Sequence, residues 1–105
     1  MNEISVSDLA QKHNSGEDFL LLDVREPDEI ATASIAWATA IPMGEVKLRL
    51  AELPTDKPIA VLCHSGGRSG RVTAFLNENG FPKAVNVAGG IDAWSESIDP
   101  SVPTY

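Results

Sequence analysis

Residues 60–76 read AVLCHSGGRSGRVTAFL, in which an apolar run passes through a loop of small and basic residues into a segment with helical spacing. The apolar run, PIAVLC at residues 58–63, is typical of a parallel strand that is covered on both faces. Val72 and Leu76 then follow at helical spacing, and Gly80 is suited to end the helix. A strand, a tight loop and a helix in this order indicate one unit of an α/β sheet.

The same alternation of apolar runs and helix-like segments continues on both sides of this stretch, without an internal repeat, low-complexity tract or linker. Ser7 is the expected capping residue of the first helix, and Pro27 suits the first turn of the second. We expect strands near residue 4 and at residues 19–24, 40–43, 58–63 and 84–89, and helices at residues 7–13, 25–30, 44–53, 69–80 and 89–98. The expected helix at residues 44–53 has an imperfect apolar face, formed by Val46, Leu48, Leu50 and Leu53. This order of elements predicts an α/β fold with a parallel sheet.

The length and net charge of the chain limit the number of domains and the kinds of partner that it can have. At 105 residues, it is expected to form one domain that spans residues 1–105. Eight basic and fifteen acidic side chains give a formal net charge of −7, which argues against a nucleic acid or an anionic membrane surface as a partner. No apolar run approaches the roughly 20 residues that span a bilayer, and the first residues lack the pattern of a secretion signal. We therefore expect a cytoplasmic protein.

Cys63 is the only cysteine, so the chain can form neither an internal disulfide nor a Cys-x-x-Cys redox motif. This usage is consistent with a reducing compartment. His13 and His64 are the only histidines, and no cysteine cluster accompanies them. We therefore expect neither a metal site nor a cofactor.

The position of Cys63 indicates a functional site, because parallel α/β sheets bind ligands beyond the carboxyl ends of their strands. Gly66 and Gly67 allow the backbone to curl so that its N–H groups point inward, and a helix that begins near Ser69 adds its unpaired amides. Such a nest binds an anion and lowers the pKa of a thiol. We interpret Cys63 as a nucleophile, and the alternative is a packing residue, since free cysteine is often buried.

The neighbours of Cys63 admit functional and structural interpretations. Arg68 and Arg71 supply positive charge near the thiol, although Arg71 is equally consistent with a solvated helix residue. His64 is either a proton shuttle or an exposed loop residue. Ser69 is interpreted as the N-cap of the following helix, a role that also helps to form the nest.

Three separated motifs, LLDVREPDE at residues 21–29, CHSGGRS at residues 63–69 and VAGGIDAW at residues 87–94, resemble those of the single-domain rhodaneses, which are sulfurtransferases. The resemblance implies a rhodanese-like three-layer α/β domain with a central, mostly parallel five-stranded sheet flanked by helices. It also implies a cysteine that takes a sulfane sulfur from a donor such as thiosulfate, becomes a persulfide, and passes the sulfur to cyanide or a thiol.

Carried over residue by residue, the resemblance makes Cys63 the persulfide carrier. The active loop around it consists of His64, Ser65, Gly66, Gly67, Arg68 and Ser69. Asp23 and Arg25 match the Asp-x-Arg of the first motif and imply a supporting charge network, since a carboxylate beside the cysteine would oppose thiolate formation. The implied turn and core residues of the third motif are Gly89, Gly90 and Trp94. The implied partners are a small sulfur-containing anion as donor and cyanide, a thiol or a protein as acceptor.

One segment departs from the family pattern. The sequence ASIAWA at residues 33–38 stands where the family often has Gly-His-Ile-Pro-Gly-Ala, so the histidine, the proline and both glycines are absent. This changes the expected shape of the loop and of its surface. Trp37 replaces the last glycine, and it is interpreted as a core residue or, if exposed, as part of a binding patch.

Three alternative functions differ from the main one in specific features. Protein tyrosine phosphatases carry Cys-x5-Arg around a tetrahedral phosphate, whereas Cys63 and Arg68 enclose four residues. Rhodanese-like modules that only bind partners commonly lack the cysteine, which is present here. Sulfurtransferases that use 3-mercaptopyruvate typically have a Cys-Gly-Ser/Ala-Gly loop, which CHSGG does not match.

Overall fold

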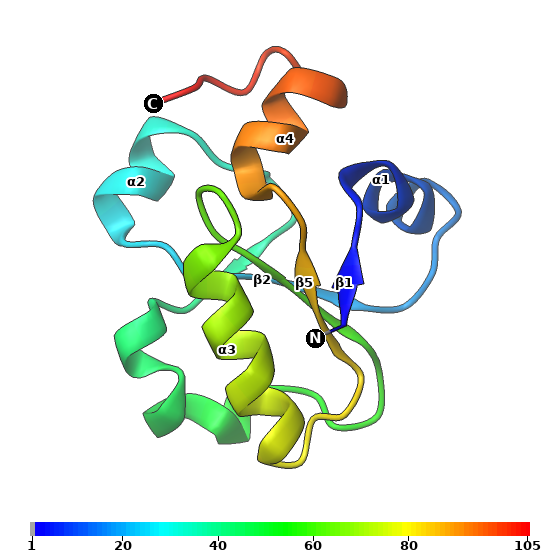
Figure 1. Ribbon diagram of the computed structural model, residues 1–105, viewed down its shortest axis with the longest axis vertical. Helices are drawn as coiled ribbons and strands as arrows, with labels where there is room; N and C mark the ends of the chain where they lie inside the picture. The colour runs from blue at the N-terminus through cyan, green and yellow to red at the C-terminus, as the bar shows by residue number, and fades with distance from the viewer. Residues whose placement is uncertain (1) are drawn as a thin grey trace.

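Five strands form one parallel sheet in the order β1-β5-β4-β2-β3 in the computed structural model, which describes residues 2–105 (Figure 1). The strands are β1 Glu3–Ile4, β2 Leu20–Asp23, β3 Thr39–Ala40, β4 Ile59–Leu62 and β5 Ala84–Val87. In the register of the central strands, Leu22 of β2 pairs with Val61 of β4, which pairs with Asn86 of β5. The five-stranded α/β fold expected from the sequence is confirmed, and each of these pairings is parallel.

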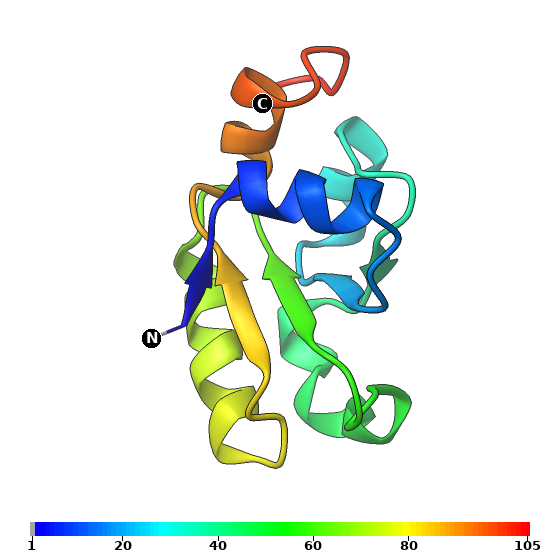
Figure 2. The ribbon, with the colours of Figure 1, turned by 90° about the vertical axis from the view of Figure 1, so that its right-hand side faces the viewer.

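Helices cover both faces of this sheet (Figure 2). They are α1 Val6–Asn14, α2 Pro27–Thr32, the 3-10 helices η1 Met43–Glu45 and η2 Lys47–Glu52, α3 Gly67–Glu78 and α4 Gly90–Ser97. Side chains of α1 and α4 pack in one apolar cluster, whereas those of α3 and the two 3-10 helices belong to the other. The short helix α2 lies between β2 and β3 in the chain and starts at Pro27, as expected.

Alternate residues of the central strands point to opposite clusters. Leu21 and Leu62 pack with α1 and α4, while Leu22 and Val61 pack on the side of α3. All four side chains are essentially buried, which explains why these strands read as continuous apolar runs. Burial of each one contributes about 1.5–3 kcal/mol. Cys63 lies at the end of the second cluster, where β4 leaves the sheet.

The segment predicted as one helix at residues 44–53 instead forms η1 and η2. Its apolar residues are two or three positions apart, which does not fit the 3.6-residue period of an α-helix. Val46 and Leu53 are buried, but Leu48 is 84% exposed, so its assignment to the apolar face was wrong. Arg49 interrupts the helical backbone with φ −117° and ψ 21° and pairs with acidic neighbours on either side.

Three element boundaries also differ from the expected ones. Ser5, rather than Ser7, is the N-cap of α1, and its side chain accepts a hydrogen bond from the first turn. The N-cap of α3 is Gly66 in a left-handed conformation, so the cap assigned to Ser69 was wrong. That residue lies inside the first turn, where its side chain is free for another partner. The strand β3 ends before Pro42, which has no N–H for a ladder.

Trp37 packs on the core in the segment that departs from the family pattern. Its half-buried ring stacks on His13 with the centroids 3.8 Å apart and meets Phe19 and Trp94 edge-on at 5.9 and 6.1 Å. The tryptophan thus occupies apolar volume beside the cluster of α1 and α4. This agrees with its interpretation as a core residue.

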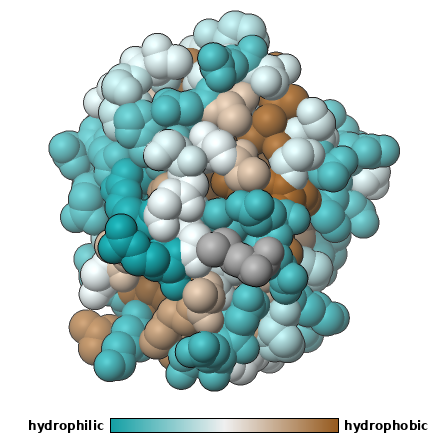
Figure 3. All heavy atoms as spheres, in the orientation of Figure 1, coloured by the Kyte–Doolittle hydropathy of each residue, from teal (hydrophilic) through white to brown (hydrophobic). Residues whose placement is uncertain are grey.

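The outer face shown in Figure 3 is mostly hydrophilic, with hydrophobic residues in separate small areas. Within residues 2–105, no helix combines the length and the apolar composition that crossing a membrane requires.

Candidate active site

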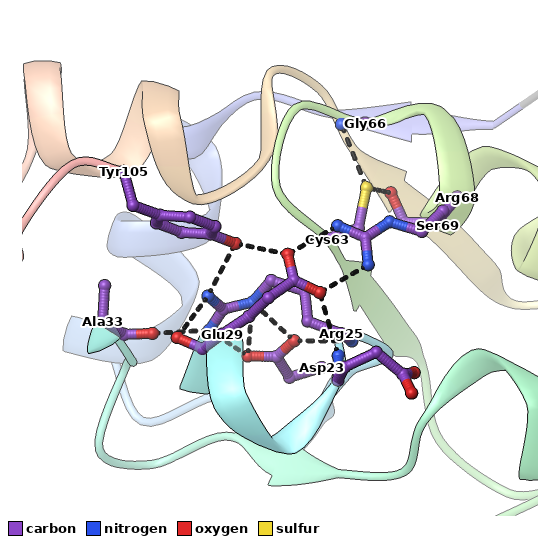
Figure 4. Close-up of polar contacts among 10 residues, drawn as sticks. Asp23, Arg25, Glu29, Ala33, Cys63, Gly66, Arg68, Ser69 and Tyr105 are labelled. Carbon is purple, nitrogen blue, oxygen red and sulfur yellow. Dashed lines mark hydrogen bonds and ion pairs between the residues drawn. The ribbon is translucent and has the colours of Figure 1, made fainter. Parts of the chain in front are cut away.

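Cys63 lies in the loop between β4 and α3, and its side chain is buried. The backbone N–H of Gly66 points at Sγ from 3.1 Å, and the hydroxyl of Ser69 lies 3.2 Å from it (Figure 4). Both donors come from the loop and the first turn of α3. The structure therefore builds the predicted nest of donors around the sulfur.

The loop can turn its N–H groups inward because α4 holds its carbonyl groups on the other side. The Cys63 carbonyl accepts from the Ile91 N–H at 2.9 Å, and the His64 carbonyl accepts from the Asp92 N–H at 3.1 Å. Gly90 makes this close approach possible, since a Cβ there would collide with both carbonyl oxygens. The first turn of α4 thus fixes the orientation of the active loop.

The pKa of Cys63 is lower than its ordinary value of 9.0. Burial alone would raise this pKa, because the thiolate loses contact with water. The hydroxyl of Ser69 and the backbone N–H groups of Ser69, Gly66 and Ser65 outweigh burial by donating to the sulfur. The thiolate is therefore stabilised mainly by hydrogen bonds of the kind that the predicted nest supplies, and the arginines that the sequence also suggested are not among the main causes.

Ser69 is shared between the sulfur and Asn86 of β5. Its Oγ lies 2.5 Å from Asn86 Oδ1 as well as 3.2 Å from Cys63 Sγ, although a hydroxyl has only one proton to donate. The Nδ2 group of Asn86 donates to the Gly66 carbonyl at 3.2 Å, which orients the amide and leaves its oxygen toward Ser69. Asn86 therefore holds the serine in place beside the thiol.

Arg68 forms a two-pronged ion pair with Glu29 of α2, with N–O distances of 2.6 and 2.8 Å. Glu29 also accepts the hydroxyl of Tyr105 at 2.7 Å. The hydrogen bonds from Arg68 hold the pKa of Glu29 well below its usual range, against the effect of burial. The sequence suggested that the positive charge of Arg68 acts on the thiol. In the structure, this charge is offset by the carboxylate of Glu29.

Asp23 and Arg25 form a second, fully buried pair at the end of β2, with 2.7 Å between Nη2 and Oδ2. Arg25 also donates to the Ala33 carbonyl at 2.8 Å and to the Tyr105 hydroxyl at 3.1 Å. The arginine thereby connects β2, the segment after α2 and the C-terminal residue. Neither Asp23 nor Arg25 makes a hydrogen bond to the sulfur, and their supporting role stays a prediction.

Residues 5–97 match the rhodanese-like domain family. The chain belongs to the rhodanese-like family. A sulfurtransferase of Allochromatium vinosum is 39% identical, over 97% of this chain and 95% of that protein. YtwF of Bacillus subtilis is 40% identical, over 95% of this chain and 96% of its own length. The crystal structure of a rhodanese-like domain protein from Staphylococcus aureus superposes with a TM-score of 0.86 at 30% identity, covering 100% of this chain and 99% of that one.

In this rhodanese-like chain, the other residues predicted in or near the active loop differ in their contacts and exposure. Ser65 supplies a backbone N–H while its side chain is exposed, and Gly67 opens α3. The ring of His64 stacks on Tyr105 with centroids 4.0 Å apart, and its Nε2 lies 3.0 Å from Asp92 Oδ1 without hydrogen-bond geometry. Arg71 is exposed and lines a shallow apolar hollow on α3. Of these residues, Ser65 alone helps to lower the pKa of Cys63, through its backbone N–H.

Three residues of the site in this rhodanese-like chain were not singled out from the sequence. Glu29 lies in the first motif, and Asn86 is a polar residue in an otherwise apolar strand, which is a signal for a buried hydrogen-bond partner. Tyr105 has no comparable signal. Within residues 2–105, no group of three or more His, Cys, Asp and Glu side chains could hold a metal ion.

Proposed function

We propose that this member of the rhodanese-like family is a sulfurtransferase in which Cys63 carries a sulfane sulfur as a persulfide. The donor is thiosulfate or a related sulfane sulfur compound, and the acceptor is cyanide, a small thiol or a protein thiol. The observation that carries the proposal is the convergence of the Ser69 hydroxyl and the Gly66 N–H on the sulfur of the only cysteine.

The reaction proceeds in two displacements at sulfur. The Cys63 thiolate attacks the outer sulfur of thiosulfate, the S–S bond of the donor breaks, and sulfite leaves with the bonding electron pair. An acceptor thiolate or cyanide then attacks the outer sulfur of the persulfide and restores the Cys63 thiolate. The donors around Sγ stabilise negative charge before and after each displacement.

The size of the loop favours a sulfur carrier over a cysteine phosphatase. Four residues separate Cys63 from Arg68, and the guanidinium is engaged by Glu29. A persulfide needs donors that converge near one atom, whereas a phosphate dianion needs a wider ring and a free arginine. The lowered pKa of Cys63 likewise supports catalysis over a purely partner-binding role.

The remaining roles follow from the same geometry. Asp23 and Arg25 support the site by joining β2 to the segment after α2, and the loop from His64 to Arg68 forms the cradle. The proposal includes a single domain over residues 1–105 that acts in the cytoplasm, where reducing conditions keep the thiol free. It involves neither a cofactor nor a metal ion.

Intact mass spectrometry tests the proposal. After incubation with thiosulfate, the wild-type protein is expected to gain one sulfur, which a reductant removes. Cys63→Ser is expected to gain none and to transfer no sulfur to cyanide, because a hydroxyl cannot form a persulfide. Thermal melting of both proteins verifies that the variant is folded. Full sulfur transfer by the folded serine variant would end the assignment of Cys63.

A further inference from the structure

The ion pair between Arg68 and Glu29 controls how much positive charge Arg68 presents beside the active loop. We propose that Glu29 makes the Cys63 site selective for sulfur donors of low net charge, such as alkyl persulfides, over dianions such as thiosulfate. This inference rests on the proposed function and concerns only which donors the site accepts efficiently.

The guanidinium of Arg68 lies between the Cys63 sulfur and the Glu29 carboxylate in the view of Figure 4. The hydrogen bonds that Arg68 donates to Glu29 are the main cause that raises the pKa of Arg68, and the charge of Cys63 adds a smaller contribution. The arginine is thus near enough to the sulfur to attract an anionic donor. Its charge is already balanced by the carboxylate on its other side.

Glu29 is not free to move away when a donor arrives. Its two carboxylate oxygens accept from Arg68 at 2.6 and 2.8 Å, and Oε2 also accepts from Tyr105 at 2.7 Å. Oε1 accepts from the Glu26 N–H at 3.0 Å, which closes the capping box of α2. The carboxylate side chain is only 17% exposed, so water and salt screen it weakly.

Two further arginines lie close to the loop in the sequence or the fold, and neither is paired with Glu29. Arg71 is exposed and lines the apolar hollow on α3. Arg25 is paired with Asp23 in the interior. Asp92 adds a further negative charge beside His64 at the other side of the loop. Because Glu29 offsets the charge of Arg68, a dianion that approaches the thiolate gains less attraction from this arginine than an unpaired guanidinium would give, whereas a donor without net charge is little affected.

The same displacement proceeds with an alkyl persulfide. The Cys63 thiolate attacks the terminal sulfur of R–S–S⁻, in which R carries a positively charged ammonium group. The S–S bond breaks, and the alkyl thiolate R–S⁻ leaves with the electron pair and takes up a proton from water or from its own ammonium group. The products are the Cys63 persulfide and the free thiol, so atoms and electrons balance without a further reactant. Neither the attacking nor the leaving group in this step is a dianion.

The experiment compares two donors on three proteins. Wild type, Glu29→Gln and Glu26→Gln are loaded with thiosulfate and with the persulfide of cysteine methyl ester, a zwitterion without net charge, and the rate of sulfur gain is followed by mass spectrometry. Glu29→Gln is expected to raise the thiosulfate-to-persulfide rate ratio roughly tenfold, because one negative charge at the entrance is removed. Glu26→Gln removes the same charge from an exposed residue of the same turn and is expected to leave the ratio within about twofold.

Salt dependence of the wild-type protein provides a second readout that needs no variant. Added sodium chloride is expected to speed loading from thiosulfate and to leave loading from the zwitterion unchanged, because screening reduces repulsion between like charges. Slower thiosulfate loading in salt, or an unchanged or lower rate ratio in Glu29→Gln, would overturn the inference while leaving persulfide chemistry in place. Failure of the wild-type protein to load from either donor would instead overturn the proposed function.

Discussion

At the scale of single residues, Ser69 and Asn86 determine the state of the thiol. The serine hydroxyl lies within hydrogen-bond distance of both the Cys63 sulfur and the amide oxygen of Asn86. When Cys63 is a thiolate, its sulfur carries the negative charge and is the stronger acceptor. The serine hydroxyl then donates its hydrogen bond to the sulfur. The hydroxyl of Ser69 is thus a donor that can turn toward the sulfur when Cys63 ionises. The backbone N–H of Gly66 is a second donor, and its direction is fixed.

Replacement of this hydroxyl tests its role. Ser69→Ala is expected to raise the pKa of Cys63, because it removes the side-chain donor that favours the thiolate. The rate of sulfur loading at neutral pH should fall about tenfold, and stability should fall by about 1 kcal/mol through the loss of a buried hydrogen bond. The pH dependence of thiol alkylation measures the pKa. Ser65→Ala is the matched control, since that residue contributes only its backbone; an unchanged alkylation profile in Ser69→Ala would contradict the role.

The sequence predicted these residues only in part. Cys63 and Gly66 stand out because a strand end, a Gly-Gly pair and a helix start coincide in a few positions. Ser69 was expected near the site but as a cap, since a serine near a helix start usually has that role. Glu29 lies 39 positions before its partner Arg68, and Tyr105 lies 76 positions after its partner Glu29. No local sequence pattern links partners that are so far apart.

At the scale of elements, the first turn of α4 orients the active loop. Its N–H groups bind the carbonyls of Cys63 and His64, so that the N–H groups of the loop remain for the sulfur. This contact joins the β4–α3 loop to an element that follows β5. The packing of α4 is therefore part of the site.

Gly90→Ala is expected to reduce sulfur loading at least tenfold. Gly90 has φ +60°, and its Cβ would collide with the Cys63 and His64 carbonyls, so the loop has to move. The left-handed backbone adds a cost of about 1–2 kcal/mol for a residue with a side chain. Gly80→Ala is a suitable control, because Gly80 has φ +96° with open space around it. Equal losses of loading in the two variants would show that backbone strain alone is responsible.

Element prediction succeeded where the chain is buried on both faces or has a clear start signal. The central strands and α2 follow from LLLD, IAVL and the proline at position 27. The segment at residues 44–53 was less predictable, because a backbone break at Arg49 and its ion pairs override the helix propensity of the sequence. Its exposed Leu48 shows how little one apolar residue reveals about burial.

At the scale of the whole molecule, paired charges connect segments that the sheet alone does not join. Arg68 ties α3 to α2 through its ion pair with Glu29. Arg25, whose ion pair is with Asp23, ties β2 to Tyr105 through a hydrogen bond. These ion pairs are partly or completely buried. Their contribution to the stability of the fold is therefore lost when the carboxylate of the pair becomes protonated.

Acid is expected to weaken the fold in a manner that depends on Glu29. Its pKa in the folded protein lies below its ordinary value of 4.5, so the ion pair contributes full stability above that pH and loses it as the pH falls further. Urea unfolding of wild type and Glu29→Gln at pH 7, 5 and 3 measures this contribution. The stability difference between the two proteins should shrink toward pH 3. A difference that stays constant with pH would mean that the carboxylate does not stabilise the fold through its charge.

The position of β5 between β1 and β4 has a consequence for protein synthesis. Cys63 is made before Asn86, which holds Ser69, and before Ile91 and Asp92, which hold the loop carbonyls. A ribosome-bound chain that ends before α4 lacks the N–H groups of Ile91 and Asp92 that orient the loop carbonyls, so we expect the donors around its sulfur to be less well fixed. We therefore expect the thiolate to be favoured fully only after α4 has been translated and docked, which leaves the nascent thiol less reactive toward alkylation and oxidation.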